Sequence, residues 1–156
     1  MKEQMSVYLL LYLIVFVAPI SNLIHEIGHT VGAKIAKASN ILISIGRGKR
    51  IIKIVFPKLE VHVGLLFFTA GVTESTREKD YTSFEKLYIT FLGPFFNAII
   101  VVIFFGIYQF TSNEFILVFM LYNSWLFLMN CVPFKIKEQE SDGFIMLKEI
   151  IAKRTK

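Results

Sequence analysis

The sequence predicts a mainly α-helical membrane protein with three transmembrane helices and a small membrane-associated β region between the first and the second. The chain of 156 residues is 54% hydrophobic and contains 16 Phe, and its mean hydropathy is +0.59, which is too apolar for an ordinary soluble domain. Three stretches carry no charged side chain: residues 7–20, 87–110 and 115–134. The second and third are each long enough to cross about 30 Å of hydrocarbon as a helix.

We expect the spans at about residues 6–37, 87–110 and 114–134. The opening stretch has the outline of a secretory signal, because Lys2 precedes an apolar run. Pro19 is a poor neighbour for cleavage, so we expect the span to be retained. Pro19 also predicts a kink, after which the helix restarts. No linker, repeat or low-complexity segment divides the sequence, which predicts one domain over residues 1–156.

The segment between the first two spans has a different composition. Residues 40–73 are rich in β-branched side chains and are interrupted by Gly and Pro, which predicts two to four short strands. Strands at membrane depth need paired and shielded backbone groups. We therefore expect a small sheet at the cytoplasmic face.

The distribution of basic residues predicts the topology. Of 17 Lys and Arg, ten lie between Lys34 and Lys86, six lie from Lys135 onward, and none lies in the turn between the second and third spans. The positive-inside rule then places the N-terminus outside and the C-terminus in the cytoplasm. The net charge of +5 reports this topology, so we expect the lipid bilayer and no nucleic acid as a partner. Richness in Ile, Lys and Phe is compatible with a bacterial cell membrane.

The segment "HEIGH" at residues 25–29 predicts a metal centre. On a helix, His25 and His29 lie one turn apart on one face, with Glu26 beside them. This HExxH spacing is typical of zinc proteases, in which the metal keeps one coordination position for water and the glutamate serves as general base. Histidines near a helix end are often only hydrogen-bonded at the interface. Ionisable groups inside a membrane are costly, however, and a metal would compensate them.

A third ligand must come from elsewhere in the chain. Asp142 follows the third span on the cytoplasmic side and begins an apolar pattern that predicts a short tail helix at about residues 142–153. His62 lies on the same side, within the strand-rich segment. We favour Asp142 and keep His62 as the alternative, since Glu114 falls at the opposite face.

These motifs resemble the site-2 protease family of intramembrane zinc metalloproteases. "HEIGH", "GPFFNA" at 93–98 and "NCVP" leading to "SDGF" at 130–144 occur in the family's order. The resemblance covers about residues 21–145. It implies that His25, His29 and Asp142 hold one zinc and that Glu26 is the catalytic base. It also implies a membrane protein or peptide as substrate, and a regulatory partner remains open.

Four further motif residues are candidates for substrate binding. Gly93 and Pro94 either permit close helix packing and a kink or shape a substrate cleft. Asn97 and Asn130 carry amides that need partners in lipid, and each would either bind a substrate peptide group or orient a ligand.

The sequence thus predicts a zinc-dependent intramembrane endopeptidase that cleaves near the cytoplasmic face. Two alternatives belong to other classes: a non-catalytic membrane relative with a regulatory or binding role, and a metal-handling membrane protein. The intact Glu26 favours the enzyme, because neither alternative needs a base beside the metal.

Overall fold

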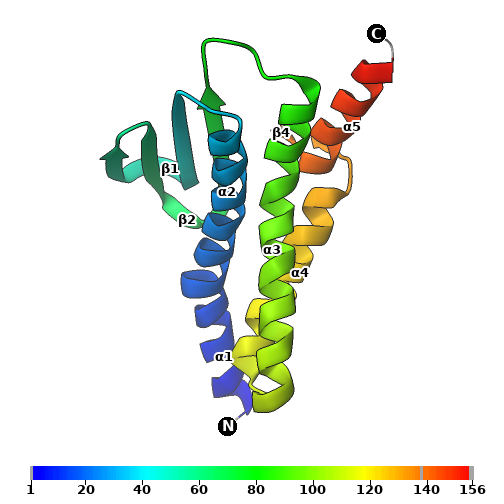
Figure 1. Cartoon of the computed structure of the whole chain (residues 1–156). Coiled ribbons are helices and arrows are strands. Elements are labelled where there is room, and N and C mark those ends of the chain that lie inside the picture. Colours follow the sequence, from blue (N-terminus) through cyan, green and yellow to red (C-terminus); the bar gives the residue numbers. More distant parts are fainter. Residues whose placement is uncertain (1, 138, 155–156) are drawn as a thin grey trace.

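The computed structural model describes residues 2–137 and 139–154. Three helical columns stand side by side, and a β-sheet lies against one end of the first column (Figure 1). Three of the described helices are long and apolar enough to cross a membrane: Gln4–Ile35, Ser83–Thr111 and Glu114–Cys131. In the sequence, the sheet comes between the first and second of these helices. This arrangement confirms the predicted fold class.

The first column changes its helical geometry halfway along. It consists of α1 (Lys2–Tyr12), a π-helical segment η1 (Leu13–Val17) and α2 (Ala18–Ile35). The Ala18 N–H bonds to the Leu13 carbonyl, and Pro19 occupies the first turn of α2. Proline has no N–H to donate to the preceding turn, and a π segment absorbs this irregularity. The expected restart at Pro19 therefore takes place without any break in the helix.

The other two columns begin or end at residues other than those predicted. α3 (Ser83–Thr111) begins four residues earlier than expected, because Thr82 and Glu85 form a capping box at its start. α4 (Glu114–Cys131) ends three residues earlier than expected. Val132 adopts an extended backbone, as residues before a proline usually do.

The strand-rich segment forms two strands, β1 (Asn40–Phe56) and β2 (Leu59–Thr76), a number within the predicted two to four. The prediction that the strands are short is wrong, and the segment ends three residues later than expected. β1 bends at Gly46 and Gly48, whose φ angles of 79° and 86° suit glycine. Each strand therefore contributes two extended segments to the sheet. Within the sheet, residues 40–45 pair with residues 71–76 on one side, and residues 41–45 pair with residues 59–63 on the other. Residues 59–63 also pair with residues 52–56.

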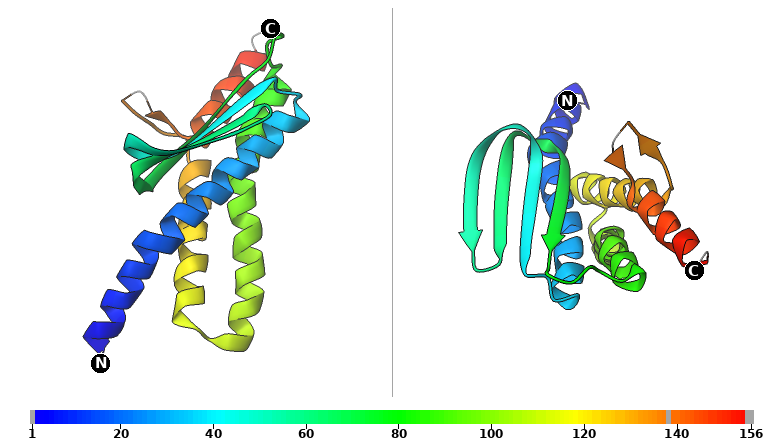
Figure 2. Two further views of the ribbon diagram at one scale, coloured as in Figure 1. Left: turned by 90° about the vertical axis from the view of Figure 1, so that its left-hand side faces the viewer. Right: turned by 90° about the horizontal axis from the view of Figure 1, so that it is seen from above.

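This register places residues 71–76 at the edge of the sheet nearest the helices. α2 lies between the sheet and the other helices when the molecule is seen along the columns (Figure 2). Arg77 fixes the end of the sheet to two helices, because its guanidinium donates to the Ala36 carbonyl at 2.6 Å and to both carboxylate oxygens of Glu85 at 2.7 and 2.8 Å. The edge of the sheet is therefore held in place beside α2.

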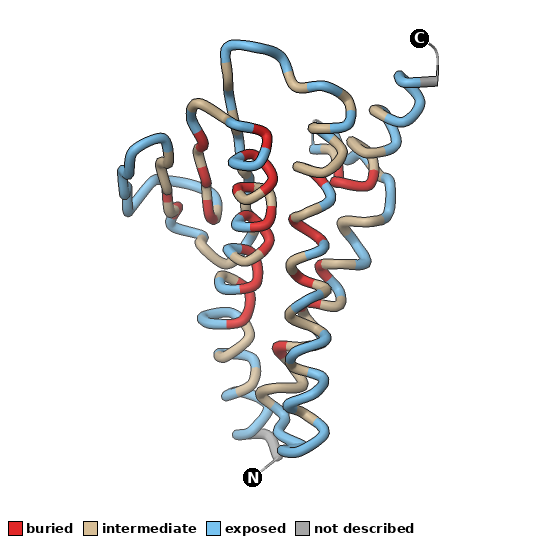
Figure 3. Tube along the Cα trace, viewed as in Figure 1, coloured by how far each residue is buried: buried red, intermediate tan, exposed pale blue. Residues whose placement is uncertain are grey.

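The chain after α4 returns to the same end of the molecule. A short hairpin of β3 (Lys135–Ile136) and β4 (Gln139–Glu140) leads into α5 (Asp142–Arg154), which packs against α3 and α4. Buried residues concentrate along α2 and on the faces of α3 and α4 that meet it (Figure 3). The core therefore surrounds the motif at residues 25–29 and the start of α5.

Candidate metal centre

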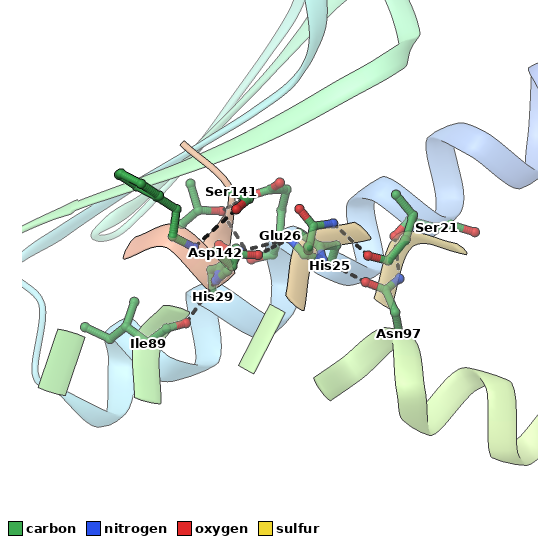
Figure 4. Close-up of polar contacts among 12 residues, drawn as sticks. Ser21, His25, Glu26, His29, Ile89, Asn97, Ser141 and Asp142 are labelled. Atoms are coloured by element: carbon green, nitrogen blue, oxygen red, sulfur yellow. Dashed lines mark hydrogen bonds and ion pairs between the residues drawn. The ribbon is translucent and has the colours of Figure 1, made fainter. Parts of the chain in front are cut away.

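Three side chains from two helices converge in this core. His25 and His29 of α2 place their Nε2 atoms 3.0 Å apart. The Asp142 carboxylate at the start of α5 lies 3.1 Å from His25 Nε2 and 3.5 Å from His29 Nε2 (Figure 4). Within residues 2–137 and 139–154, these three form the group of His, Cys, Asp and Glu side chains whose geometry suits a metal ion.

Hydrogen bonds behind the imidazoles fix the tautomer of each. The Ser21 carbonyl can only accept, so the Asn97 Nδ2 that lies 3.2 Å away must face it. Asn97 Oδ1 then faces His25 Nδ1 at 2.7 Å, which must carry the proton. His29 Nδ1 likewise donates to the Ile89 carbonyl at 2.9 Å. Both Nε2 atoms therefore present lone pairs to the same point.

This donor set fits a divalent cation. Two imidazole lone pairs and a carboxylate repel one another unless a positive charge lies between them, and Asp142 Oδ2 is buried without accepting a hydrogen bond. Zinc ligands 2.0–2.1 Å from a tetrahedral ion lie about 3.3 Å from one another. His25 Nε2 lies 3.0 Å from His29 Nε2 and 3.1 Å from Asp142 Oδ2, and both distances are close to that spacing. The other carboxylate oxygen, Oδ1, lies 3.5 Å from His29 Nε2.

Glu26 lies next to the ligands and is held by the edge of the sheet. Its side chain is 3% exposed, and Oε2 accepts a hydrogen bond of 2.6 Å from the Thr73 hydroxyl. A Cβ atom on Gly71 would lie 2.5 Å from Glu26 Oε1, so only glycine leaves room for the carboxylate. Sequence reasoning missed both partners. Gly71 and Thr73 are two apart on a strand and thus share one face, but nothing in the sequence pairs that face with Glu26.

Close packing of α2 against α3 brings His29 into position. A Cβ atom on Gly28 would lie 2.2 Å from the Leu92 carbonyl oxygen, and one on Gly93 would lie 2.3 Å from His29 Cε1. Gly28 and Gly32 form a G-x-x-x-G pair, which is typical of close helix contacts in membranes and is a signal that sequence reasoning overlooked. Of the two predicted roles for Gly93 and the fully buried Pro94, the geometry favours helix packing.

Asn97 lies behind His25 and away from the clefts beside Glu26. It is fully buried, and its amide also donates to Asn123 Oδ1 at 2.9 Å. Asn123 in turn donates to the Ser21 hydroxyl at 2.8 Å. A polar network thus joins all three spans behind one imidazole. Of the two roles left open for Asn97, orienting a ligand agrees with this geometry and contacting substrate does not.

We expect Asn97→Leu to lower the affinity for zinc by roughly 10- to 100-fold, the usual effect of removing a partner that orients a metal ligand. Without the Asn97 carbonyl oxygen, the His25 ring is free to rotate and to change tautomer. Competition with a chromogenic chelator measures the affinity. Ser124→Ala, which removes a hydroxyl bonded within α4 at 2.9 Å, serves as control and should leave the affinity unchanged.

Two clefts adjoin the sheet at Gly71, and Asn130 lines both; Glu26 lines the smaller one. One has a volume of about 280 Å³ and lies between α2, α4 and the edge of the sheet. The other has a volume of about 520 Å³ and lies between the edge residues 70–72 and the segment 139–141. The predicted substrate-binding role of Asn130 agrees with this location.

His62 lies apart from the metal group. Its register partners are Ser44 and Lys53 within the sheet, and its imidazole is hydrogen-bonded to the Glu60 carboxylate. Lys53 and His62 together lower the pKa of Glu60. The predicted alternative of His62 as third ligand therefore has no geometric support, because its strand directs it to a different carboxylate.

Comparison with known proteins agrees with this site. A sequence model of peptidase family M50, the site-2 protease family, matches residues 11–152. The match covers most of the chain, including all three residues of the metal group, and confirms the resemblance drawn from the sequence motifs. A comparison with proteins of curated function finds no match.

Proposed function

Because this chain belongs to peptidase family M50, a family of membrane metalloproteases, we propose that it is a zinc-dependent endopeptidase that cleaves a transmembrane or membrane-associated peptide near the cytoplasmic face. The observation that carries the proposal is the convergence of His25, His29 and Asp142 beside Glu26. His25, Glu26 and His29 lie on a helix long and apolar enough to span a membrane.

The chemistry divides between the metal and the chain. Bound zinc would polarise the scissile carbonyl and activate water. Glu26 is the general base, which takes a proton from the attacking water and passes it to the leaving amine. The Thr73 hydroxyl donates to Oε2 at 2.6 Å, and we assign the transferred proton to Oε1, which does not accept that bond.

The substrate must be extended before it can react, because a helix hides its carbonyls in internal hydrogen bonds. Residues 71–76 pair with residues 40–45 on one side, and the cleft of about 520 Å³ adjoins this edge at residues 70–72. A substrate segment added to this edge would satisfy its own backbone groups. It would also run past Glu26, since Gly71 and Thr73 contact that side chain.

Cleavage of a single-span substrate tests the proposal. The detergent-solubilised protein should cleave members of a panel of single-span helices that carry helix-breaking residues near the cytoplasmic end. A chelator should abolish cleavage, and one equivalent of zinc should restore it. Cleavage that survives complete removal of metal would contradict the proposal.

The cytoplasmic location rests on charge. The sheet, the hairpin and α5 lie at one end of the columns, opposite the N-terminus and the turn between α3 and α4 (Figure 1). Of the 17 Lys and Arg, 16 lie between Lys34 and the C-terminus, outside the uncharged second and third spans. From the positive-inside rule, we propose that the basic end, and with it the metal centre, lies in the cytoplasmic half of the membrane. We propose further that this membrane is a bacterial cell membrane.

Cysteine labelling checks this orientation. In a Cys131→Ala background, a cysteine introduced by Ser112→Cys in the turn between α3 and α4 should react with an impermeant reagent on intact cells. A cysteine introduced by Lys49→Cys in the sheet should react only after the membrane is opened. The reverse pattern would invert the topology while leaving the catalytic proposal intact.

A further inference from the structure

One buried amide on the catalytic face of α2 has no role in the chemistry described above. Asn22 lies three residues before His25 and four before Glu26, so the three side chains share one face of the helix. It is 6% exposed. Within the part of the chain that the structure describes, its Nδ2 has no hydrogen-bond partner.

An unpaired amide donor in a protein interior is unfavourable. Other buried amides nearby are satisfied: Asn97 donates to Ser21 and Asn123, and Asn123 donates to Ser21 and Phe119. The Tyr122 hydroxyl is a hydrogen-bonding neighbour of the Asn22 side chain, although Nδ2 itself has no partner within hydrogen-bond geometry. The donor of Asn22 is therefore available to a ligand.

The surroundings of Asn22 indicate what that ligand is. Asn22 lines the cleft of about 280 Å³ together with His25, Glu26, the edge segment 69–71 and apolar side chains of α4. An extended peptide on the sheet edge would pass this cleft and bring one carbonyl oxygen for every residue. Positions four apart on a helix are about 5–6 Å apart, and an extended chain advances about 3.3 Å per residue. Asn22 thus reaches a peptide group within two residues of the one that faces Glu26.

We propose that Asn22 is a substrate-binding residue whose side-chain amide donates a hydrogen bond to a backbone carbonyl of the extended substrate, within two residues of the scissile bond. The inference rests on the proposed protease function. Because the bond is made to a group that does not react, it stabilises bound substrate and transition state equally. Its loss should raise KM and leave kcat unchanged.

The test combines protein variants with backbone-modified peptides. The probe is a ten-residue peptide that covers the cleavage site mapped with the substrate panel, and a series of esters replaces one peptide bond at a time. Binding is measured in the Glu26→Gln background, so that no probe is cleaved. An ester carbonyl is a weaker hydrogen-bond acceptor than a peptide carbonyl. The ester also lacks the peptide N–H, but this loss affects the protein with Asn22 and the Asn22→Leu variant alike. A double-mutant cycle therefore isolates the contact to Asn22.

We expect Asn22→Leu to weaken binding of the parent peptide about tenfold, the effect of one neutral hydrogen bond. One ester in the series should weaken binding to the protein that has Asn22 and have little further effect on the Asn22→Leu variant. Asn22→Gln, which keeps the amide donor, should restore part of the affinity. Thr30→Val removes the other buried unpaired group of α2 and should change nothing.

The outcomes separate this inference from the function on which it rests. If the wild type cleaves the panel but Asn22→Leu binds the peptide as tightly as its parent, or no ester shows coupling, Asn22 does not contact the substrate. Loss of zinc from Asn22→Leu would instead make Asn22 part of the metal site's scaffold and overturn the inference. A wild type that neither binds nor cleaves any peptide would overturn the proposed function together with it.

Discussion

Glu26→Gln should lower the rate of peptide cleavage by roughly 10²- to 10⁴-fold, the range typical of lost acid–base catalysis, while one zinc stays bound. Glutamine keeps the size of the side chain and can still accept the Thr73 hydrogen bond through its carbonyl oxygen. It cannot take a proton from water. The ligand atoms of His25, His29 and Asp142 are unaffected, since Glu26 is not one of the group.

Single-turnover cleavage measures the rate, and metal analysis of the same preparation measures the bound zinc. His25→Ala is the matched comparison, because it should lose metal and activity together. A non-catalytic relative would show no rate to lose, and a metal-handling protein would bind zinc without cleaving the panel. If Glu26→Gln cleaved as fast as the wild type, the assigned base would be wrong even with zinc present.

Much of the fold could be predicted from the sequence because membrane spans depend on composition alone. Residues 87–110 and 115–134 carry no charge over lengths that suit a bilayer, and the structure has helices there. The helix ends were less predictable, because they depend on single side chains. Thr82 extends α3 by a capping box, and Pro133 ends α4 early through its effect on Val132.

In the candidate site, contacts within one helix turn could be predicted from the sequence, whereas contacts between distant segments could not. The spacing of His25 and His29 is local to one helix turn, so the sequence alone indicates that they share a metal. Thr73 and Gly71 reach Glu26 across about 47 residues of chain, and only the sheet register and the Arg77 anchor bring them there. The G-x-x-x-G pair of Gly28 and Gly32 was visible in the sequence, but Gly28 lies within the catalytic motif and was interpreted only as part of it.

The third metal ligand could not be identified from the sequence alone, because its identity depends on the tertiary structure. Asp142 and His62 both lie on the predicted cytoplasmic side, and distance along the chain does not distinguish them. In the structure, α5 begins against the end of α4, because a Cβ atom on Gly143 would lie 2.2 Å from the Cys131 carbonyl oxygen. Glycine at that position allows the close approach that directs Asp142 to the imidazoles.

We therefore expect Asp142→Ala to lose zinc and with it all measurable cleavage. Removing a ligand should cost more than the roughly 10- to 100-fold loss of affinity that follows removal of an outer partner, because the remaining His25 and His29 leave the metal with two protein ligands. Metal content after dialysis against a weak chelator, read beside the cleavage rate, measures the effect. Asp142→Asn keeps the shape of the side chain and removes the charge, so it should bind zinc weakly without disturbing the start of α5.

His62→Ala is the matched control, because it removes the rival candidate from a sheet position where the imidazole pairs with Glu60. It should keep one zinc per chain and the wild-type rate. Circular dichroism of each variant separates loss of metal from loss of the helical fold. Zinc retained at full stoichiometry in Asp142→Ala and lost in His62→Ala would move the third ligand from α5 to the sheet. The edge at Gly71 and Thr73 would then have to leave Glu26 for His62 to reach the metal.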